Sequence, residues 1–518
     1  MRADSAVASP PAATAAASLT RRASLTAIAA LVDYAAKLGV GLVVTPLLVH
    51  GLGRALYGMW EMLLQLIGYM TAADGRPTDA LRLVIASRQS DDPAAQRRRV
   101  GAALAVWALF LPLIAGLGAT VIWLAPAITR AAPDQAAAVR LAAGLLVLSF
   151  VAATLASVPE AVLRGMNLGY KRMGWQAALS VIGGLLLAGA VTLGLGLPGL
   201  GAAQVILFAL TGLCFWMLVR RYVPGFGVAR PTRAEVRQLA GMSVWLAAGD
   251  LISKLLLASD LIILGIVVSP AVVTTYVLTG YAARTALGIF GFTVGSAMPG
   301  LGGLVGQGQY ERAAALRGEL LALTWLFAVG VGATVLVWNP SFLGLWVGAE
   351  NYAGVWPNVL IVCVMTQTAF IRSDAYLIDV ALQPRLRVLV GAAAAAVTIG
   401  AAIPLTGAFG IVGLCAGILL GRATQSVAYP LIAAACLRRP ARIAWRPLVR
   451  PLVVTAALFA GATALGTRVA AQGWAPWALG VVLTAAGAPL VALALGLPTP
   501  ARTAVLGRLR GIVRSIRG

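Results

Sequence analysis

Stretches of about 20 apolar residues follow one another along almost the whole chain, separated by short polar turns. An α-helix rises about 1.5 Å per residue, so each stretch can cross the hydrocarbon layer of a bilayer, roughly 30 Å thick. The pattern therefore predicts an all-α, polytopic membrane protein. We expect about fourteen transmembrane helices, near residues 26–49, 57–82, 101–126, 136–157, 175–196, 199–219, 241–268, 272–298, 318–345, 354–380, 387–406, 410–437, 450–468 and 476–496.

The composition excludes an ordinary soluble domain. Hydrophobic residues make up 60% of the chain, only 11% of residues are charged, and the mean hydropathy is +0.90. The four cysteines all fall within predicted spans and lack the spacing of a disulfide framework. With His50 as the single histidine and no cysteine cluster, the sequence predicts no metal site and no cofactor.

The formal net charge of +23 reflects membrane topology. Most of the forty Lys and Arg residues occupy alternate loops and both termini, whereas the opposite loops hold only Arg54, Arg130, Arg140 and Arg468. This is the positive-inside pattern, and it predicts a multi-pass protein of the plasma (inner) membrane with both termini in the cytoplasm. Membrane lipids with anionic head groups are the expected partners of the basic loops, and no nucleic acid is expected.

Two pairs of signatures recur at nearly the same offset. Asp33-x-x-x-Lys37 lies in the first predicted span and Asp250-x-x-x-Lys254 lies 217 residues later, in the seventh. The turn at Leu197–Gly201 resembles Ile403-Pro404 followed by Gly410–Gly413, with Gly201 and Gly413 212 residues apart. Six crossings return the chain to its starting side, so the pattern predicts two six-helix lobes in a parallel repeat, with two extra helices at the C-terminus.

The resulting domain boundaries follow the predicted spans. Residues 1–25, rich in Ala and Ser, are expected to form a disordered cytoplasmic tail. The remaining divisions are an N-lobe (26–219), a cytoplasmic linker (220–240), a C-lobe (241–437), a cytoplasmic loop (438–449), the last two spans (450–496) and a basic cytoplasmic tail (497–518).

Four cations fall near the middle of their predicted spans, namely Lys37, Lys254, Arg284 and Arg422. Ionisable groups at this depth are costly and are therefore functional candidates. Arginine keeps its charge when buried and offers a planar fork suited to phosphate. The four residues predict a central cationic cavity that binds a phosphate or pyrophosphate head group.

Acidic residues accompany these cations. Asp33 and Asp250 lie roughly 6 to 7 Å nearer the cytoplasm, one helical turn before each lysine, while Asp260 and Glu61 lie toward the outer side. Asp33, Asp250 and Asp260 are candidates for ion coupling or for charge pairing. Neutralisation of each lysine by its own aspartate, as a purely structural pair, is the alternative.

No catalytic signature is present in the sequence. It contains no G-x-x-x-x-G-K-[ST] phosphate loop and no long outer loop that would hold an enzymatic site. We therefore expect a secondary transporter, not an enzyme, and assign no catalytic residue.

The chain resembles the polysaccharide (O-antigen type) flippase branch of the multidrug/oligosaccharidyl-lipid/polysaccharide (MOP) exporter superfamily. The matching stretches are Thr45–Leu48 with Gly51–Gly53 and Tyr57–Trp60; Pro159–Tyr170; Ser253-Lys254 with Ser259-Asp260 and Tyr276; Pro299–Leu301; and Pro340–Trp346. The run Asp74–Asp79 departs from this family, in which many members continue span two as a Gly-rich helix. The usual first-helix sequence of the related lipid II flippases is absent.

The resemblance implies a two-lobed, fourteen-helix fold and a function. The expected substrate is a lipid-linked oligosaccharide on a polyprenyl (undecaprenyl) pyrophosphate carrier, flipped from the inner to the outer leaflet by alternating access. Its role would lie in polysaccharide or lipopolysaccharide biosynthesis, with a polysaccharide polymerase and glycosyltransferases as possible partners. A lipid II flippase, a cation-coupled multidrug or metabolite antiporter of the same fold, and a non-transporting scaffold remain as alternatives.

Overall fold

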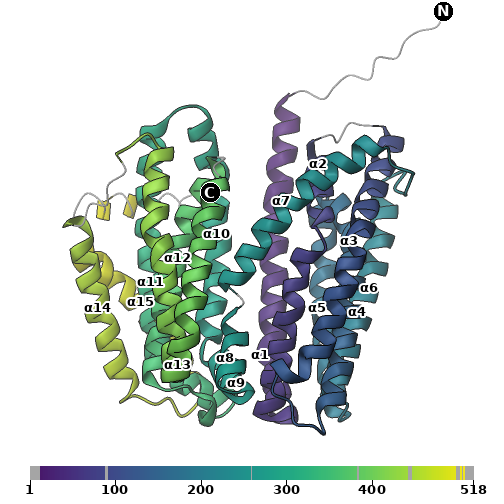
Figure 1. Cartoon of the computed structure of the whole chain (residues 1–518). Helices are drawn as coiled ribbons and strands as arrows, with labels where there is room; N and C mark the ends of the chain where they lie inside the picture. The colour runs from purple at the N-terminus through teal and green to yellow at the C-terminus, as the bar shows by residue number, and fades with distance from the viewer. Residues whose placement is uncertain are drawn as a thin grey trace, which may run out of the picture. The chain divides into compact units, whose positions relative to one another are not determined.

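The computed structural model describes residues 12–87, 92–257, 259–381, 384–440, 446–497, 502–503 and 506–507. Within these residues the chain forms α-helices and one short 3-10 helix, and contains no β-strand (Figure 1). The elements are α1 (Ala12–Ala73), α2 (Pro77–Ser87), α3 (Pro93–Ile128), α4 (Ala136–Gly165), α5 (Gly169–Thr192), α6 (Gly196–Tyr222), α7 (Arg233–Leu257), α8 (Ser259–Val267), α9 (Pro270–Thr279), α10 (Tyr281–Gly306), α11 (Tyr310–Trp346), η1 (Ala349–Asn351), α12 (Val355–Val380), α13 (Pro384–Cys436), α14 (Arg446–Gly466) and α15 (Trp474–Gly496).

These helices account for the predicted spans. Among the described residues, ten helices are long and apolar enough to cross a membrane. Two of them, α1 and α13, each contain two spans, because the helix is interrupted at Gly53 (φ 79°) and Gly410 (φ 55°), a backbone conformation that glycine adopts easily. The consecutive pairs α7–α8 and α9–α10 supply the remaining two spans. The expectation of an all-α protein with about fourteen transmembrane helices is confirmed.

The first helix begins ahead of the first predicted span. Helix α1 starts at Ala12 and not near residue 26, and the expectation of a disordered tail over residues 1–25 stays a prediction. Alanine has the highest intrinsic helix propensity, and an Ala-rich stretch leading directly into an apolar span extends the helix of that span. Residues 1–11 and most of the expected C-terminal tail, 497–518, lie outside the described residues.

Span two is interrupted where the sequence departs from the family pattern. Helix α1 ends at Ala73 and α2 starts at Pro77, with Gly75 (φ 73°) and Arg76 (φ 53°) between them. Proline is favoured at the first position of a helix, because the backbone N–H that it lacks would have no partner within the helix there. Pro77 therefore suits the start of α2. The expected cytoplasmic linker, 220–240, is also partly helical, because α7 begins at Arg233.

The chain divides into two compact units. The first unit comprises the residues up to Leu52, Leu66–Ala127 and Ala131–Leu251. The second unit comprises Gly53–Gln65, Ile128–Arg130 and the chain from Ile252 onward. The segment Gly53–Gln65, which we call the outer part of span two after its predicted side, therefore belongs to the second unit. The six-helix repeat and the lobe boundaries at 219 and 241 stay predictions.

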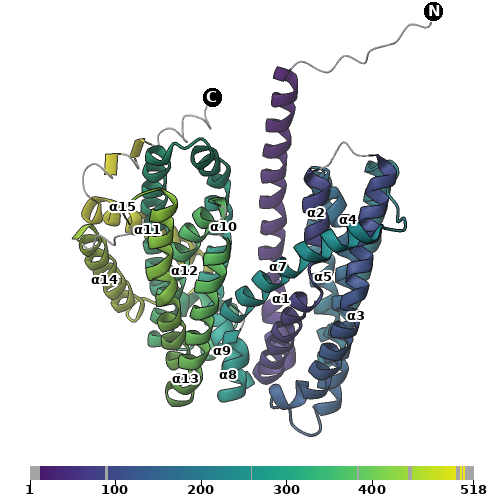
Figure 2. The ribbon, with the colours of Figure 1, turned by 45° about the horizontal axis from the view of Figure 1, so that its top comes forward.

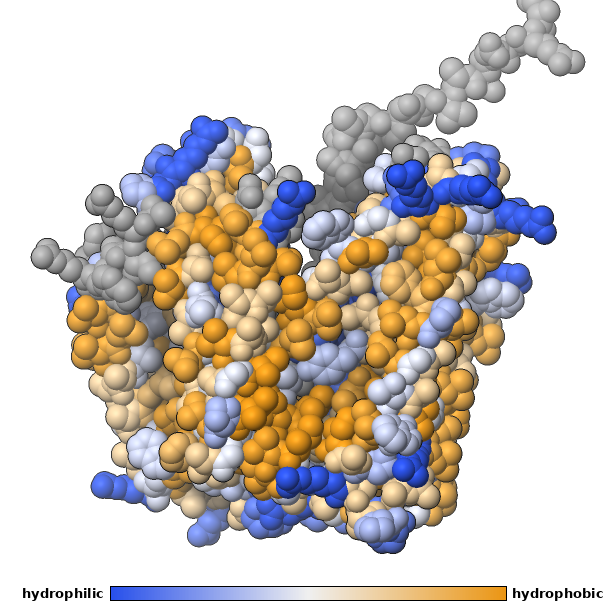
Figure 3. All heavy atoms as spheres, viewed as in Figure 1, coloured by the Kyte–Doolittle hydropathy of each residue, from blue (hydrophilic) through white to orange (hydrophobic). Residues whose placement is uncertain are grey.

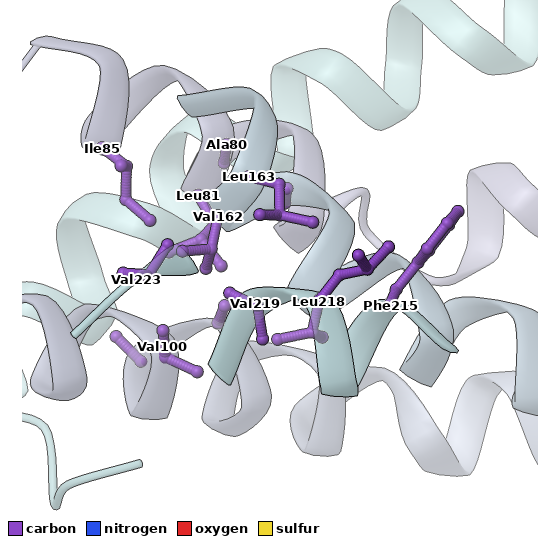
Figure 4. Close-up of a cluster of buried hydrophobic side chains, with 14 of the residues drawn as sticks. Ala80, Leu81, Ile85, Val100, Val162, Leu163, Phe215, Leu218, Val219 and Val223 are labelled. Atoms are coloured by element: carbon purple, nitrogen blue, oxygen red, sulfur yellow. The ribbon is translucent and has the colours of Figure 1, made fainter. Parts of the chain in front are cut away.

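In the first unit, α2 is fixed by an apolar core. Leu81 and Ile85 of α2 pack with Val100 of α3, Leu163 of α4 and Val219 of α6, each at most 2% exposed (Figure 4). Helices α4 and α6 lie side by side (Figure 1). Inside a bilayer, where lipid tails are as apolar as these side chains, close packing of the side chains stabilises the arrangement.

In the second unit, the last two helices pack on α11. Trp325 of α11 donates a hydrogen bond from its indole nitrogen to Thr455 of α14 (2.9 Å), and Trp338 donates to Thr484 of α15 (3.1 Å). Gly496 and Gly480 leave room for these two indole rings. Figures 1 and 2 both show α14 and α15 beside α11. Helices α14 and α15 therefore belong to the second unit.

The outer part of span two is fastened to α9 within the second unit. Arg54 donates to the hydroxyl of Thr275 (2.6 Å), and the hydroxyl of Thr274 donates to the carbonyl of Arg54 (2.6 Å). The backbones also approach closely, because a Cβ placed on Gly58 would lie 1.8 Å from the carbonyl oxygen of Pro270. A residue larger than glycine has no room at this crossing.

The surface is that of a membrane protein. Large aliphatic side chains such as Leu109, Leu185, Leu389 and Leu479 are more than 60% exposed. On each unit taken by itself, hydrophobic atoms dominate the middle of the visible face and hydrophilic atoms gather toward its two ends (Figure 3). Such extended apolar surface is unfavourable in water and favourable in contact with lipid tails.

The crossing of Gly58 over α9 gives a first prediction. Gly58→Ala should lower the thermal stability of the protein in detergent by about 1–3 kcal/mol, because the added methyl group forces two backbones apart. Gly39→Ala is the matched control, since nothing lies within 4 Å of a Cβ at Gly39 and alanine favours helix. Equal unfolding temperatures for the two variants would contradict the close approach.

Candidate functional site

The first Asp–Lys signature forms an ion pair. The ammonium group of Lys37 lies 2.8 Å from a carboxylate oxygen of Asp33, and the lysine side chain is 50% exposed. Both residues belong to α1, where the i, i+4 spacing brings them to one face. Lys37 is therefore paired with the aspartate of its own helix. Because the lysine side chain is half-exposed, the other N–H donors of its ammonium group remain accessible.

The second signature is arranged differently. The carboxylate of Asp250 in α7 pairs with Arg76 (2.9 Å) and accepts a hydrogen bond from Thr71 (2.7 Å). Arg76 also binds Asp79, and its backbone N–H donates to Asp74 (2.7 Å). The interruption of span two therefore supplies the cation that neutralises Asp250. Pairing of Asp250 with its neighbour Lys254 is not what the structure shows.

Lys254 has no ion-pair or hydrogen-bond partner among the described residues. Its side chain is half-buried in the part of α7 that belongs to the second unit. The sequence assigned it to a cationic cavity, and its charge remains available for that purpose.

Arg284 binds the end of the preceding helix. Its guanidinium donates to the carbonyl of Val277 and lies over the ring of Tyr276, 5.4 Å from the ring centre. Helix α9 ends at Thr279, and the carbonyl of Thr279 accepts a hydrogen bond from Asn339 (2.9 Å). Carbonyls freed at a helix break inside a bilayer must find donors in the protein, and Arg284 supplies one. Arg284 therefore stabilises the end of α9, in addition to any role in binding.

Arg422 is buried at the contact of α12 and α13. Its side chain is 8% exposed and donates to the hydroxyl of Thr368. Arg372 of α12 and Asp260 of α8 lie close enough for their charges to interact with that of Arg422. Asp260 also accepts a hydrogen bond from Tyr276 (3.0 Å).

These groups form one charge cluster in the second unit, which we define as Glu61, Asp260, Arg284, Arg372 and Arg422. Glu61 comes from the outer part of span two, where its carboxylate accepts a hydrogen bond from Tyr57 and interacts with the charge of Arg284. Cys415 interacts electrostatically with Asp260, Arg284 and Arg422, which links these three charges in space. Fully ionised, the cluster holds three cations and two anions, which leaves one net positive charge.

The sequence found part of this cluster. The sequence predicts Arg284 and Arg422 as binding cations and treats Asp260 and Glu61 as acids toward the outer side, and the binding role of these residues stays a prediction. Arg372 was missed, because its position in the inner half of span ten placed it away from Arg422. Only the packing of α12 against α13 brings the two guanidinium groups together. Lys37 belongs to the first unit and Lys254 is not part of the cluster.

A metal site is not evident in the described part of the chain, where no three His, Cys, Asp or Glu side chains gather. The arrangement consists of guanidinium donors, carboxylates and hydroxyls. Such a set is suited to holding an anion with several oxygen atoms.

The Arg76–Asp250 pair generates a second prediction. Arg76→Gln and Asp250→Asn should each lower the unfolding temperature, because each leaves one charge without its partner in an apolar surrounding. The double variant should recover part of the loss, with a coupling of about 0.5–3 kcal/mol. Thermal unfolding of the four proteins in one detergent measures this coupling, and strict additivity would refute the pair.

Comparison with known proteins supports the fold. Neither a protein-family model nor a curated protein matches the chain. Among solved structures, the lipid II flippase MurJ in an inward closed conformation matches with a TM-score of 0.66 at 10% identity, covering 90% of this chain and 97% of that chain. A multidrug resistance MATE family transporter of the MOP superfamily, in an inward-facing conformation, matches at 0.59 and 16% identity, over 82% and 98%. A mutant MATE transporter of Vibrio cholerae matches at 0.57 and 15%, over 81% and 98%. The chain therefore has the fold that MurJ and the MATE transporters share.

Proposed function

We propose that this protein is a flippase that moves a polyprenyl-pyrophosphate-linked oligosaccharide from the inner to the outer leaflet by alternating access. The observation that carries the proposal is the charge cluster of the second unit, in which three arginines face two carboxylates among apolar helices. One net positive charge is costly to hold there without an anionic ligand. A pyrophosphate group brings several negative charges and many acceptor oxygens, which guanidinium groups bind bidentately.

The comparisons support a substrate of this kind. The match to the lipid II flippase extends over 90% of this chain, against 82% and 81% for the two MATE transporters described above. Lipid II flipping is accordingly the second candidate function. A cation-coupled antiporter of organic cations is the third, and the surplus of arginines in the cluster disfavours it, since like charges repel.

The proposed mechanism uses carboxylates beside the binding cations. Rocking of two lobes would expose a midplane site first to one side of the membrane and then to the other. Asp260, whose charge interacts with that of Arg422, is one candidate for coupling to an ion gradient. Asp33 and Asp250, paired with Lys37 and Arg76, are the other candidates for coupling to an ion gradient. A polysaccharide polymerase and glycosyltransferases would then be the functional partners in the plasma membrane.

A reconstitution experiment tests this function. Vesicles containing the purified protein would carry undecaprenyl-pyrophosphate disaccharide with a fluorescent label that an impermeant reductant quenches. We expect quenching to proceed beyond the outer-leaflet fraction, while labelled phosphatidylcholine stays at that fraction. Movement of both lipids at equal rates, or uptake of an organic cation without movement of the glycolipid, would overturn the proposal. A lipid II probe in parallel vesicles separates the first two candidates.

The role of Arg422 gives a third prediction. Arg422→Ala should slow glycolipid movement by roughly tenfold or more, because a charged hydrogen bond contributes about 1.5–3 kcal/mol. Arg422→Lys should restore part of the rate, since a point charge replaces the planar fork. Membrane abundance and unfolding temperature must be measured alongside.

Arg317→Lys provides the matched control for that series. Arg317 is also an arginine of the second unit in a largely buried ion pair, 2.8 Å from Asp374, and it is not a member of the charge cluster. We expect this variant to lose stability without a specific loss of transport per folded molecule. Equal transport defects in Arg422→Lys and Arg317→Lys would show that Arg422 acts through folding alone.

A further inference from the structure

A hollow of about 940 Å³ lies in the first unit between α2 and the beginning of α7, two helices labelled in Figure 1. Its lining combines two cations with a large apolar wall. Arg233 and Arg237 contribute the guanidinium groups, and Met242, Trp245, Leu246 and Leu83 contribute apolar surface. None of these residues belongs to the sites described above.

The two arginines place two like charges on one helix, and no acid of the described chain pairs with either. Arg233 and Arg237 are exposed and stand one helical turn apart, about 6 Å along α7, which places them on one face of the helix. Neither has an ion-pair or hydrogen-bond partner in the part of the chain that the structure describes. Their charges are therefore available to a ligand.

Glu235, the acidic residue of α7 that lies nearest to these arginines in the sequence, binds other partners. Glu235 accepts hydrogen bonds from the backbone N–H (2.7 Å) and hydroxyl (2.9 Å) of Thr232, and it pairs with Arg98 (3.2 Å). Although burial acts to raise the pKa of Glu235, these hydrogen bonds and Arg98 lower it below its ordinary value. This is a capping box that fixes the start of α7 and keeps the carboxylate on Arg98.

The apolar wall continues from the charged end. Trp245 lies two turns beyond Arg237, about 12 Å along the helix, and its ring is 67% exposed. Leu83 of α2, 44% exposed, faces the same hollow. A ligand that touches both ends must be anionic at one end and apolar over the next 10 Å or so.

We propose that this hollow binds one anionic phospholipid, with its phosphodiester between Arg233 and Arg237 and an acyl chain against Met242, Trp245 and Leu83. The distribution of Lys and Arg along the sequence predicts that this end of α7 lies at the cytoplasmic leaflet. Anionic lipids give that leaflet its negative surface potential, so the ligand is abundant where the arginines stand. Because α7 also carries Asp250 and Lys254, the lipid would stabilise the helix that holds both residues in place.

Native mass spectrometry of the purified full-length protein tests the site. The probes are phosphatidylglycerol and phosphatidylcholine with identical acyl chains, added at equal concentration. We expect a preference for phosphatidylglycerol, reduced about tenfold in Arg233→Ala/Arg237→Ala because each arginine near the surface contributes to binding an anionic lipid. Trp245→Ala should weaken retention of both lipids and leave the preference between them unchanged.

The control variant is Arg220→Ala/Arg221→Ala, which removes the same charge from two exposed arginines at the end of α6. It should keep the preference for phosphatidylglycerol. An equal loss in both double variants would mean a general effect of net charge and would overturn the proposal. So would displacement of the bound lipid by an equal concentration of inorganic phosphate, because the apolar wall would then contribute nothing. Unfolding temperatures measured in phosphatidylcholine alone verify that each variant is folded.

Discussion

The structure depends on one constraint, which is that polar groups inside a bilayer must find their partners within the protein. Helices satisfy this constraint for most backbone groups. Where a helix breaks, side chains take over: Arg284 and Asn339 donate to carbonyls at the end of α9, and Arg54 and Thr274 join the outer part of span two to α9. The irregular points of the chain are consequently the points at which its polar residues gather.

The same constraint explains the two charged regions of the molecule. In the first unit, the interruption of span two at Asp74–Arg76 places a guanidinium against Asp250. In the second unit, the break between α9 and α10 and the contact of α12 with α13 gather Arg284, Arg372 and Arg422 around two carboxylates. In the first region, Arg76 pairs with both Asp79 and Asp250. The second retains a net positive charge and is the better candidate for binding an anionic head group.

Helix α7 connects several of these features within one element. A capping box fixes its first turn, two arginines with no partner in the described chain follow, and Asp250 and Lys254 lie near its other end. Its residues up to Leu251 belong to the first unit and those from Ile252 to the second. A ligand held at the start of this helix would therefore act on a segment that both units share.

The sequence by itself determined the all-α class, the number of spans and the residues that carry charge at depth. Apolar length and the cost of intramembrane charge are local properties, readable from the order of residues alone. The start of the first helix at Ala12 lies outside what the apolar pattern indicates, because the Ala-rich residues before the span have high helix propensity without being apolar enough to cross a membrane. The tertiary structure alone decided which charges meet. Pairing of Asp250 with Lys254, one turn away, is the alternative that spacing offers, yet Asp250 pairs with Arg76 across 174 positions of the sequence. The interaction of Arg372 with Arg422 also arises between two helices. Such contacts depend on how each helix is rotated about its axis and packed on its neighbour, which the spacing of residues within one helix does not specify.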